Sequence, residues 1–580
     1  MMRRTSNRLV LWGAGMLLSL SVMAQPEPDE GFDQTLIITG NRTLTVQKAY
    51  KISELPSVVD INSDQIELKY QLIPRRPITE IKLEQIEPAK VKVREPLEKL
   101  YHGYVKGGAG TFATPFLEAS YTSTRKRDFA YGVRARHLSA NDGINRPVAF
   151  SGFSENAAEL WGKKVYKKHS LETALSYNRN AYHYYGFDPQ DANIDKKDIK
   201  QAYSDISLNG KWKSYYRDSS RVNHTLYLNS YFLTDRYDAS EVGVNVAADL
   251  ESIRGNQFYT LNTGLDFIGY QSGELRPFDF MDDTSGTSLG STDQNNAIFK
   301  AVPKILFAKG GLRAAVGLGI YGQFTNKARF HAFPDLEVSY SLFNNIFIPY
   351  AGMTGSVERN GFRTLSRDNP FILSNIRALE NSVVRYKLFG GIRGTISDNL
   401  SFNLGASYQR VDDQVLYVND TLVSSENRFD LIYDDVKTLT LKGEVTYRYG
   451  EKWSATVSGH VFSYSVENEE EAWHLPSHRF ALKADYNLFD KFIIGGELAW
   501  VGKRMVKSYL PVDNIEPNEA GFTAIELDAY VDLSLSAEYR YTNRLSVFVE
   551  GHNLTATKYD IYYRFPTQRV FILGGAKYSF

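Results

Sequence analysis

Charged side chains that alternate with apolar ones are the residues of this sequence best placed to do chemistry. They are Arg385, Lys387, Arg393, Lys442, Glu444 and Arg448. Pointing into a water-filled lumen, they could line a conduit for an anionic or sugar-like solute, because rings of charge tune pore selectivity. Since both signs of charge occur, they can instead pair with one another or with the N-terminal segment, and we favour this second interpretation.

Catalytic and metal-binding motifs are absent from the sequence. The 10 His are scattered without zinc spacing, and there is no G-x-S-x-G motif or glycine-rich phosphate loop after a strand. The acidic run at 467–473 and the pair Asp282-Asp283 are interpreted as solvated loops rather than calcium sites. Because the chain has no Cys, it has neither disulfides nor thiolate metal sites. We therefore expect no enzyme, cofactor or metal.

Composition narrows the class of protein that could position these charges. The net charge is +0, which gives no reason to expect nucleic acid as a partner, and aromatic residues make up 13% of the chain. No proline- or serine-rich linker divides residues 100–580, and no apolar run there approaches the length of a membrane-spanning helix. The chain is therefore either a large β array or a transmembrane β-barrel.

The spacing of apolar residues predicts strands. In residues 439–449, Leu439, Leu441 and Val445 fall on one face, whereas Lys442 and Glu444 fall on the other. A period of two residues is that of a half-buried strand. Aromatic residues recur at the ends of the apolar faces, as interfacial girdles do in outer-membrane barrels.

Connection lengths point to a barrel as well. Short turns at 397–399, 450–452, 489–491 and 542–543 alternate with long connections at 419–426, 467–476, 507–520 and 555–566. Short periplasmic turns alternating with long outer loops are typical of outer-membrane barrels. Counted back from Phe580, the pattern gives about 22 strands, an even number as single-chain barrels require. They include 491–505 and 523–541 as single strands. The fold class predicted is all-β, a transmembrane antiparallel barrel over residues 100–580.

The two ends of the chain carry targeting signals. Arg3 and Arg4 precede an apolar run from Leu9 to Val22, and small residues before Gln25 complete a secretory signal peptide over residues 1–24. The run, about 14 residues, is shorter than the roughly 20 that span a bilayer. At the other end, Tyr578 and Phe580 resemble the signal that the outer-membrane assembly machinery reads. We expect a Gram-negative outer-membrane protein that contacts outer-membrane lipid and this machinery.

Two stretches resemble the TonB-dependent receptors. Residues 547–580 match the last two strands of that barrel, with Asn553-Leu554, Tyr559, Pro566 and the closing Tyr578-Ser579-Phe580, although Gln568 replaces the usual Gly. The octet TLIITGNR at 35–42 resembles a TonB box, the peptide that TonB pulls. Its core residues are Thr35, Leu36, Ile37, Ile38 and Thr39. The high content of aromatic residues resembles that of proteins of the Bacteroidota.

The main departure from that family is the missing plug. Only residues 43–100 lie between box and barrel, with many charges and frequent Pro, too little apolar content for a plug core. We therefore expect a plugless relative with residues 25–99 as a periplasmic or lumenal segment. A barrel of this size is normally plugged, so residues 26–100, inward-folded loops or a partner must close it.

The resemblance implies solute transport across the outer membrane, or a role as the membrane subunit of an envelope complex. A passive porin-like channel and a non-conducting scaffold are the alternatives. Possible partners are TonB and a periplasmic protein or lipoprotein, and the solute is not indicated.

Overall fold

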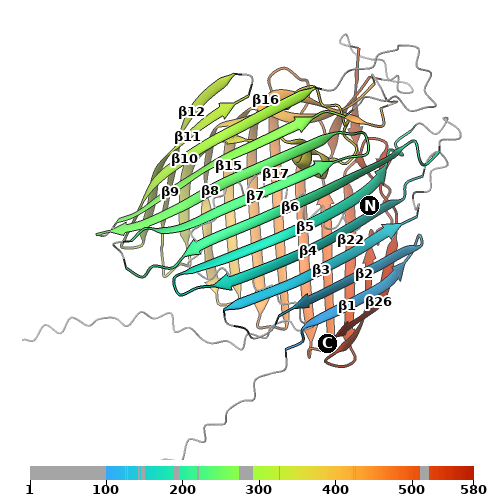
Figure 1. Cartoon of the computed structure of the whole chain (residues 1–580), viewed down its shortest axis with the longest axis horizontal. Helices are drawn as coiled ribbons and strands as arrows, with labels where there is room; N and C mark the ends of the chain where they lie inside the picture. Colours follow the sequence, from blue (N-terminus) through green and yellow to red (C-terminus); the bar gives the residue numbers. More distant parts are fainter. Residues whose placement is uncertain are drawn as a thin grey trace, which may run out of the picture. The chain divides into compact units, whose positions relative to one another are not determined.

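Apolar and polar residues alternate with a period of two along most of the chain, and the strands that they form pair into a closed antiparallel sheet (Figure 1). This computed structural model describes residues 100–580 apart from 124–125, 127, 142–143, 145–149, 188–194, 219–220, 256, 274–291, 326, 422–423, 425 and 510–520. The predicted signal peptide, the TonB-box-like octet and the remainder of residues 25–99 lie outside the described residues.

In the described residues, twenty-two strands form the barrel, and each pairs antiparallel with its neighbours. The barrel strands are β1 (Gly103–Gly110), β2 (Thr114–Thr122), β3 (Phe129–Ala140), β4 (Phe153–Val165), β5 (His169–His183), β6 (Lys200–Ser214), β7 (Asn223–Thr234), β8 (Ser240–Arg254), β9 (Gln257–Gln271), β10 (Asp293–Lys309), β11 (Leu312–Phe324), β12 (Ala328–Tyr340), β13 (Ile348–Glu358), β14 (Ser382–Ser397), β15 (Leu400–Asn419), β16 (Phe429–Tyr449), β17 (Trp453–Val466), β18 (His478–Leu488), β19 (Phe492–Val501), β22 (Tyr530–Arg540), β23 (Leu545–His552) and β26 (Phe571–Ser579). The predicted fold class and strand number are confirmed.

The last strand closes the ring against the first. Tyr104 of β1 pairs with Ser579 of β26, and the register continues to Gly110 and Leu573. The C-terminal residue takes part: the His102 N–H donates to the Phe580 carbonyl over 2.7 Å. Because the sheet closes on itself, it leaves no unpaired edge strand.

The outer face of the barrel is apolar, as the alternation predicts. In β16, Leu439 and Leu441 are 43% and 52% exposed, whereas the intervening Thr440 is buried. Leu404 on β15 and Val457 on β17 continue the exposed apolar surface. A closed barrel with an apolar outer face is the structure of a transmembrane β-barrel, in which one face meets lipid. No helix in the described residues has the length and apolar composition of a membrane span.

Short turns and long connections gather at opposite ends of the barrel. The predicted short turns join strands at the end that holds the C-terminus, and we call this the short-turn end. The turn between β10 and β11 is Gly310-Gly311, with φ of 57° and 84°, angles that favour glycine in a two-residue hairpin. Long connections such as 359–381 and 553–570 lie at the other end, the long-loop end. In outer-membrane barrels the short turns are periplasmic.

Two predicted strands are divided in the structure. The predicted strand 491–505 is β19 followed by β20 (Arg504–Ser508), and 523–541 is β21 (Thr523–Leu527) followed by β22. β20 and β21 leave the barrel sheet and pair with each other, so the chain bends at Gly502 and again at Asp528. A smaller pair, β24 (Asp560–Tyr562) and β25 (Phe565–Pro566), also lies outside the barrel sheet.

Candidate functional site

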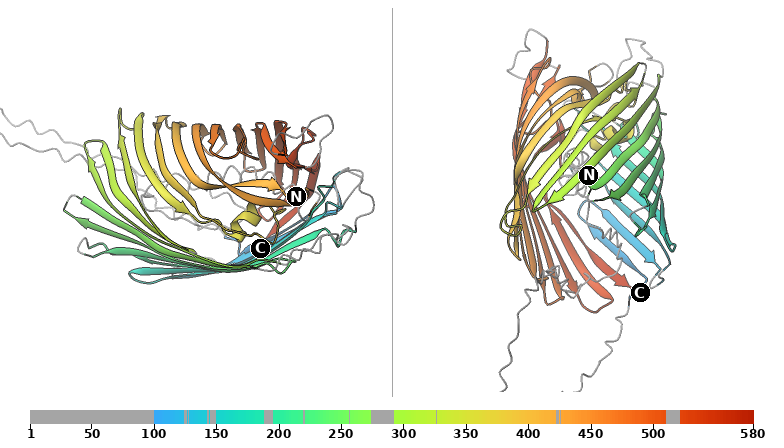
Figure 2. Two further views of the ribbon diagram at one scale, coloured as in Figure 1. Left: turned by 90° about the horizontal axis from the view of Figure 1, so that it is seen from above. Right: turned by 90° about the vertical axis from the view of Figure 1, so that its left-hand side faces the viewer.

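The connection between β13 and β14, residues 359–381, folds into the barrel. It contains helix α2 (Phe362–Asp368), which Figure 2 shows inside the ring of strands. We call residues 359–381 the lid loop. Inward-folded loops are one of the three ways in which the sequence led us to expect the lumen to be closed.

Glu241 of β8 caps the N-terminus of α2. Its side chain is completely buried, and its carboxylate accepts the N–H groups of Phe362 over 2.5 Å and Arg363 over 3.2 Å. The Tyr231 hydroxyl donates to the same carboxylate over 2.6 Å. The helix's own N-cap residue is Gly361, where a Cβ would lie 3.0 Å from the Glu241 carboxylate. The barrel wall therefore supplies the negative cap that the first turn lacks.

Three arginines of the lid loop pair with acids of the barrel wall. The Nε and Nη2 atoms of Arg363 lie 3.1 and 2.9 Å from Oδ2 of Asp205 on β6, and Arg367 contacts the same oxygen. Arg359 pairs with Asp266 on β9. The Asp205 side chain is only 5% exposed. Removing one partner of such a buried pair is strongly destabilising, so these contacts hold the lid loop against β6–β9.

The second half of the lid loop is held by hydrogen bonds. Tyr270 donates to the Ser374 carbonyl over 2.7 Å and accepts the Ile376 N–H over 3.1 Å. The Ser374 hydroxyl donates to Asp235, which also accepts from Gln201 over 3.0 Å. Asp235 lies in the turn between β7 and β8, where burial raises its pKa to about 6 despite these hydrogen bonds. The second half of the lid loop thus includes a titratable contact.

An aromatic cluster fastens the other side of the lid loop. The Phe371 and Phe565 rings stack with centroids 3.8 Å apart, and Tyr185 packs on Phe565 at 5.0 Å. Phe429 of β16 lies 5.8 Å from Phe565 and 5.2 Å from Tyr562. All five side chains are buried. The lid loop therefore connects two parts of the wall that are not neighbours in the sheet, β6–β9 and β16.

A cavity of about 880 Å³ lies between the lid loop and the barrel wall. This volume is in the range of small-molecule binding sites. Its lining combines amides, phenol rings and charges of both signs. Among these residues are Asn178, Asn180, Asn245, Gln414, Tyr182, Tyr203, Tyr321, Tyr417, Asp205, Asp266, Lys300, Arg359 and Arg367.

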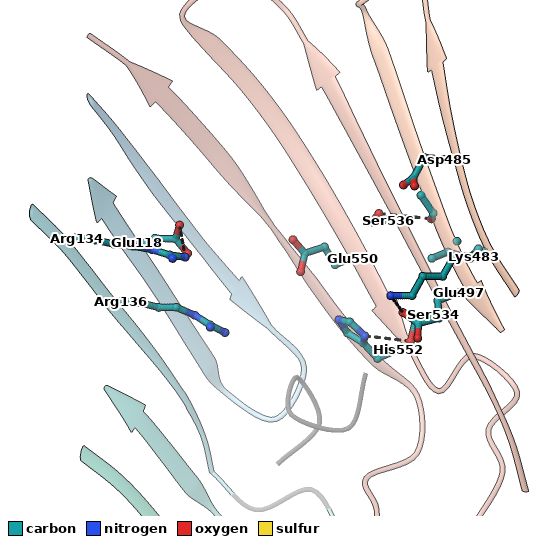
Figure 3. Close-up of a pocket in the computed structure, with 13 residues that line it drawn as sticks. Glu118, Arg134, Arg136, Lys483, Asp485, Glu497, Ser534, Ser536, Glu550 and His552 are labelled. Carbon is teal, nitrogen blue, oxygen red and sulfur yellow. Dashed lines mark hydrogen bonds and ion pairs between the residues drawn. The ribbon is translucent and has the colours of Figure 1, made fainter. Parts of the chain in front are cut away.

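A second pocket, of about 450 Å³, lies on the lumenal wall near the barrel seam. Figure 3 shows Arg134 beside Glu118 on one side of the pocket and Lys483, Glu497 and Asp485 on the other. Arg134 pairs with Glu118 over 3.2 Å, and Lys483 pairs with Glu497 over 3.6 Å. The Arg134 and Lys483 side chains are about half exposed, so such pairs add little stability. They make this part of the wall polar and of mixed charge.

The structure brings several of the sequence-predicted lumenal charges close to one another. The Arg393 guanidinium lies 5.3 Å from the Tyr350 ring, and the Lys442 ammonium lies 6.0 Å from it. Lys387 is 7% exposed and interacts electrostatically with Lys442. Lys442 also interacts with Arg393 and Glu444.

The remaining predicted charges lie apart from this group. Arg385 forms an ion pair with Asp412, and Arg410 shares that carboxylate. Arg448 is exposed near the short-turn end of β16. A role for these residues in lining a conduit stays a prediction, and the TonB-box-like residues lie outside the described part of the chain.

Sequence reasoning missed the lid loop and the wall residues that hold it. The signal was the apolar run PFILSNIRAL at 370–379, unusual for a connection at the polar end of a barrel. The buried apolar side chains in this run are Phe371, Ile372, Leu373, Ile376 and Leu379. No group of three or more His, Asp or Glu in the described residues could hold a metal ion. The arrangement can enclose a solute and close the barrel above it.

Comparison with known proteins finds the same fold at low sequence identity. No family model matches the chain, and no curated protein matches its sequence. The pyoverdine outer membrane receptor FpvA from Pseudomonas aeruginosa, bound to pyoverdine, matches with a TM-score of 0.61 and 13% identity, over 83% of this chain and 78% of the receptor. The FrpB iron transporter from Neisseria meningitidis matches with a TM-score of 0.62 and 9% identity, over 83% and 82% of the two chains.

A third match is the ferric-catecholate import receptor Fiu from E. coli. Its TM-score is 0.60 at 11% identity, over 83% of this chain and 82% of the receptor. The predicted likeness to the barrel of TonB-dependent receptors, and with it the outer-membrane barrel, is confirmed. The three proteins are described as two receptors and a transporter; that this chain is not an enzyme stays a prediction.

Proposed function

We propose that this chain is an outer-membrane transporter whose lumen is closed at the long-loop end by the lid loop. The observation that carries the proposal is the lid loop itself, held by buried ion pairs over a cavity of about 880 Å³. A barrel of twenty-two strands with an open lumen would be a wide hole in the membrane. A loop held by a limited number of ion pairs, hydrogen bonds and ring contacts can close such a barrel and still be released.

The N-terminal residues complete the proposal. Thr35 to Thr39 can add a strand to the sheet edge of TonB, with main-chain hydrogen bonds giving most of the affinity. With no family-type plug after the octet, a pull would act on residues 43–99. Their position in or under the lumen as a partial stopper is part of the proposal. The solute is left open, because the three proteins compared above share only 9–13% of their residues with the chain.

Conductance in planar bilayers tests the proposal. The lid loop is replaced from Asn360 to Asn381 by a short glycine-serine linker. The control variant, Lys163→Ala/Glu172→Ala, removes a 2.6 Å ion pair elsewhere on the wall. We expect small conductance for the wild type and the control, and a large increase when the lid loop is removed.

The other outcomes separate the alternatives. A wild type that already conducts widely is a passive porin-like channel, which contradicts the proposal. If neither the lid variant nor a further deletion of residues 26–99 conducts, the barrel is a non-conducting scaffold. If the lid variant conducts only after that deletion, the N-terminal segment is a second closure. A lipoprotein or periplasmic protein that co-purifies in fixed ratio would favour the envelope-complex alternative.

A further inference from the structure

The strands β4, β5, β6 and β7 run side by side to the short-turn end (Figure 1). A cluster of aromatic rings lies there. The His169 imidazole stacks on the Trp212 indole with centroids 5.1 Å apart, and Tyr166 lies 5.7 Å from the same indole. Tyr216 and His224 lie 5.5 and 5.8 Å from His169. These five rings form one continuous group.

The cluster belongs to the outer surface of the barrel. On β6, the exposed residues Ile206 and Leu208 mark the outward face, and Trp212 has the same parity. On β5, the exposed Leu175 marks the outward face, and His169 shares it. The rings therefore continue the apolar band at its lower edge, where Trp and Tyr gather at membrane interfaces.

Hydrogen bonds join residues 214–216 to residues 223–224 at the two ends of the connection between β6 and β7. The Asn223 side chain accepts the Tyr216 N–H over 2.7 Å and donates to the Tyr216 carbonyl over 3.0 Å. Ser214 Oγ accepts the His224 N–H over 2.7 Å and donates to Asn223 over 3.2 Å. A ring nitrogen of His169 lies 3.0 Å from the Tyr216 hydroxyl. The cluster is thus preorganised by the backbone of the turn.

Four exposed cations lie close to the rings along the chain. They are Lys167, Lys168, Arg217 and Arg221. The Arg221 guanidinium lies 5.3 Å from the Tyr216 ring. Within the described residues, none of the four forms an ion pair. The nearby acid Glu172 is bound to Lys163 over 2.6 Å, and Asp218 is the one acid in the turn itself. The patch is therefore strongly positive.

We propose that this patch binds the phosphate of an anionic phospholipid in the leaflet next to the short-turn end. Arginine and lysine close to a membrane surface attract anionic headgroups, and charge-assisted hydrogen bonds to phosphate are the strong ones. The outward rings pack on the upper part of the headgroup and the first acyl carbons. An acidic soluble partner would not need rings on the lipid-facing side, so the observations favour a lipid.

Native mass spectrometry of the full chain tests the proposal. The protein is taken from nanodiscs that contain equal amounts of phosphatidylglycerol and phosphatidylcholine. The test variant is Lys167→Gln/Lys168→Gln/Arg217→Gln/Arg221→Gln. The control, Lys309→Gln/Arg313→Gln/Lys452→Gln/Lys491→Gln, removes the same charge at other short turns. We expect selective retention of phosphatidylglycerol by the wild type and the control, and a loss of at least about tenfold in the test variant.

The fluorescence of Trp212 reports lipid binding at the cluster itself. Brominated phosphatidylglycerol should quench the tryptophan fluorescence of the wild type more than that of Trp212→Phe. With brominated phosphatidylcholine, the difference in quenching between the two proteins should be smaller. Equal retention of both lipids, or equal losses in both Gln variants, would overturn the proposal. So would displacement of the lipid by millimolar inorganic phosphate, because the site would then take the free ion. Heat-modifiable gel mobility confirms that each variant is folded.

Discussion

Asp205→Asn is expected to loosen the lid loop while leaving the ring of paired strands intact. Asp205 lies on β6, and its carboxylate is contacted by Arg363 and Arg367 of the lid loop. The barrel register of β6 with β5 and β7 uses only the backbone at this position. The substitution keeps the size of the side chain and removes its charge. The effect should therefore fall on docking of the lid loop.

The magnitude follows from the exposure of the three side chains. Asp205 and Arg363 are 5% and 20% exposed, and because Arg363 keeps some contact with solvent, breaking the pair costs about 3 kcal/mol, the low end for buried pairs. Arg367 is 49% exposed, so its contact adds at most about 1 kcal/mol. The Asn carbonyl still accepts one hydrogen bond, which returns about 1 kcal/mol. A net loss of about 2–3 kcal/mol raises the ratio of open to docked lid roughly 30- to 140-fold, at about 1.4 kcal/mol per tenfold.

Thiol labelling measures that ratio directly, because the native chain contains no Cys. Ser366 of α2 is 4% exposed in the docked lid, so Ser366→Cys reacts only when the lid opens. If opening and closing are fast, the labelling rate is proportional to the open population. Ser546→Cys, buried on β23 away from the lid loop, is the control position.

The labelling rate of Ser366→Cys should rise roughly 30- to 140-fold with Asp205→Asn, and that of Ser546→Cys should stay unchanged. A rise of less than about threefold would refute the assignment of Asp205 as a principal anchor of the lid. An equal rise at both positions would mean that the whole barrel has loosened. In a double-mutant cycle, Arg363→Gln should add little to Asp205→Asn, since residues in one ion pair are not additive.

Five further predictions concern the lid loop and the two ends of the chain. Burial raises the pKa of Asp235 from 3.8 to about 6, so the docked lid binds a proton that the open lid releases between about pH 4 and 6. Docking should weaken as pH rises through that range, and Asp235→Asn should remove the dependence of labelling, corrected for thiolate, on pH. Phe371→Ala should cost the docked lid about 3–5 kcal/mol, seen as faster labelling of the same Cys. Deleting Phe580 should slow the appearance of heat-modifiable barrel in a pulse-chase without greatly changing its final stability; unchanged kinetics would exclude a signal role. Deleting residues 26–99 should raise the conductance of the lid variant further, and Ile37→Pro should abolish energy-dependent uptake; a null result in either contradicts the stopper or the TonB box.

The barrel could be predicted from the sequence because its determinants are local. Leu439 and Leu441 face lipid and Thr440 faces inward wherever β16 lies in the sheet, so a period of two residues is sufficient. Turn and loop lengths then order the strands. The differences between the predicted and the observed strands have a different cause. β20 and β21 adjoin β19 and β22 with only two residues between them, and their sequences do not indicate that they pair with each other outside the barrel sheet.

The lid loop could not be predicted in this way because its contacts are far apart in the sequence. Arg363 meets Asp205 across 158 positions, and the Tyr184 hydroxyl donates to the Ile372 carbonyl across 188. From the sequence of its own strand, the carboxylate of Asp205 cannot be told apart from the other charges that face the lumen. It becomes an anchor only when a loop from elsewhere carries an arginine to it. The same limit applies to Glu241, whose role depends on a glycine at position 361.

The position of the lid loop constrains how a pull from the periplasm could act. The lid loop is bound to β6–β9 and β16 near the long-loop end, whereas the TonB-box-like octet precedes a first strand that begins at the short-turn end. Force on residues 35–42 reaches Gly103, which is held in the sheet by β2 and β26. The contacts of the lid loop described above are with β6–β9, β16 and the connection 553–570. Under our proposal the pull reorders residues 43–99 and leaves the lid docked. A solute that enters from the long-loop end must therefore release the lid by its own binding, with a differential affinity at least equal to the docking free energy.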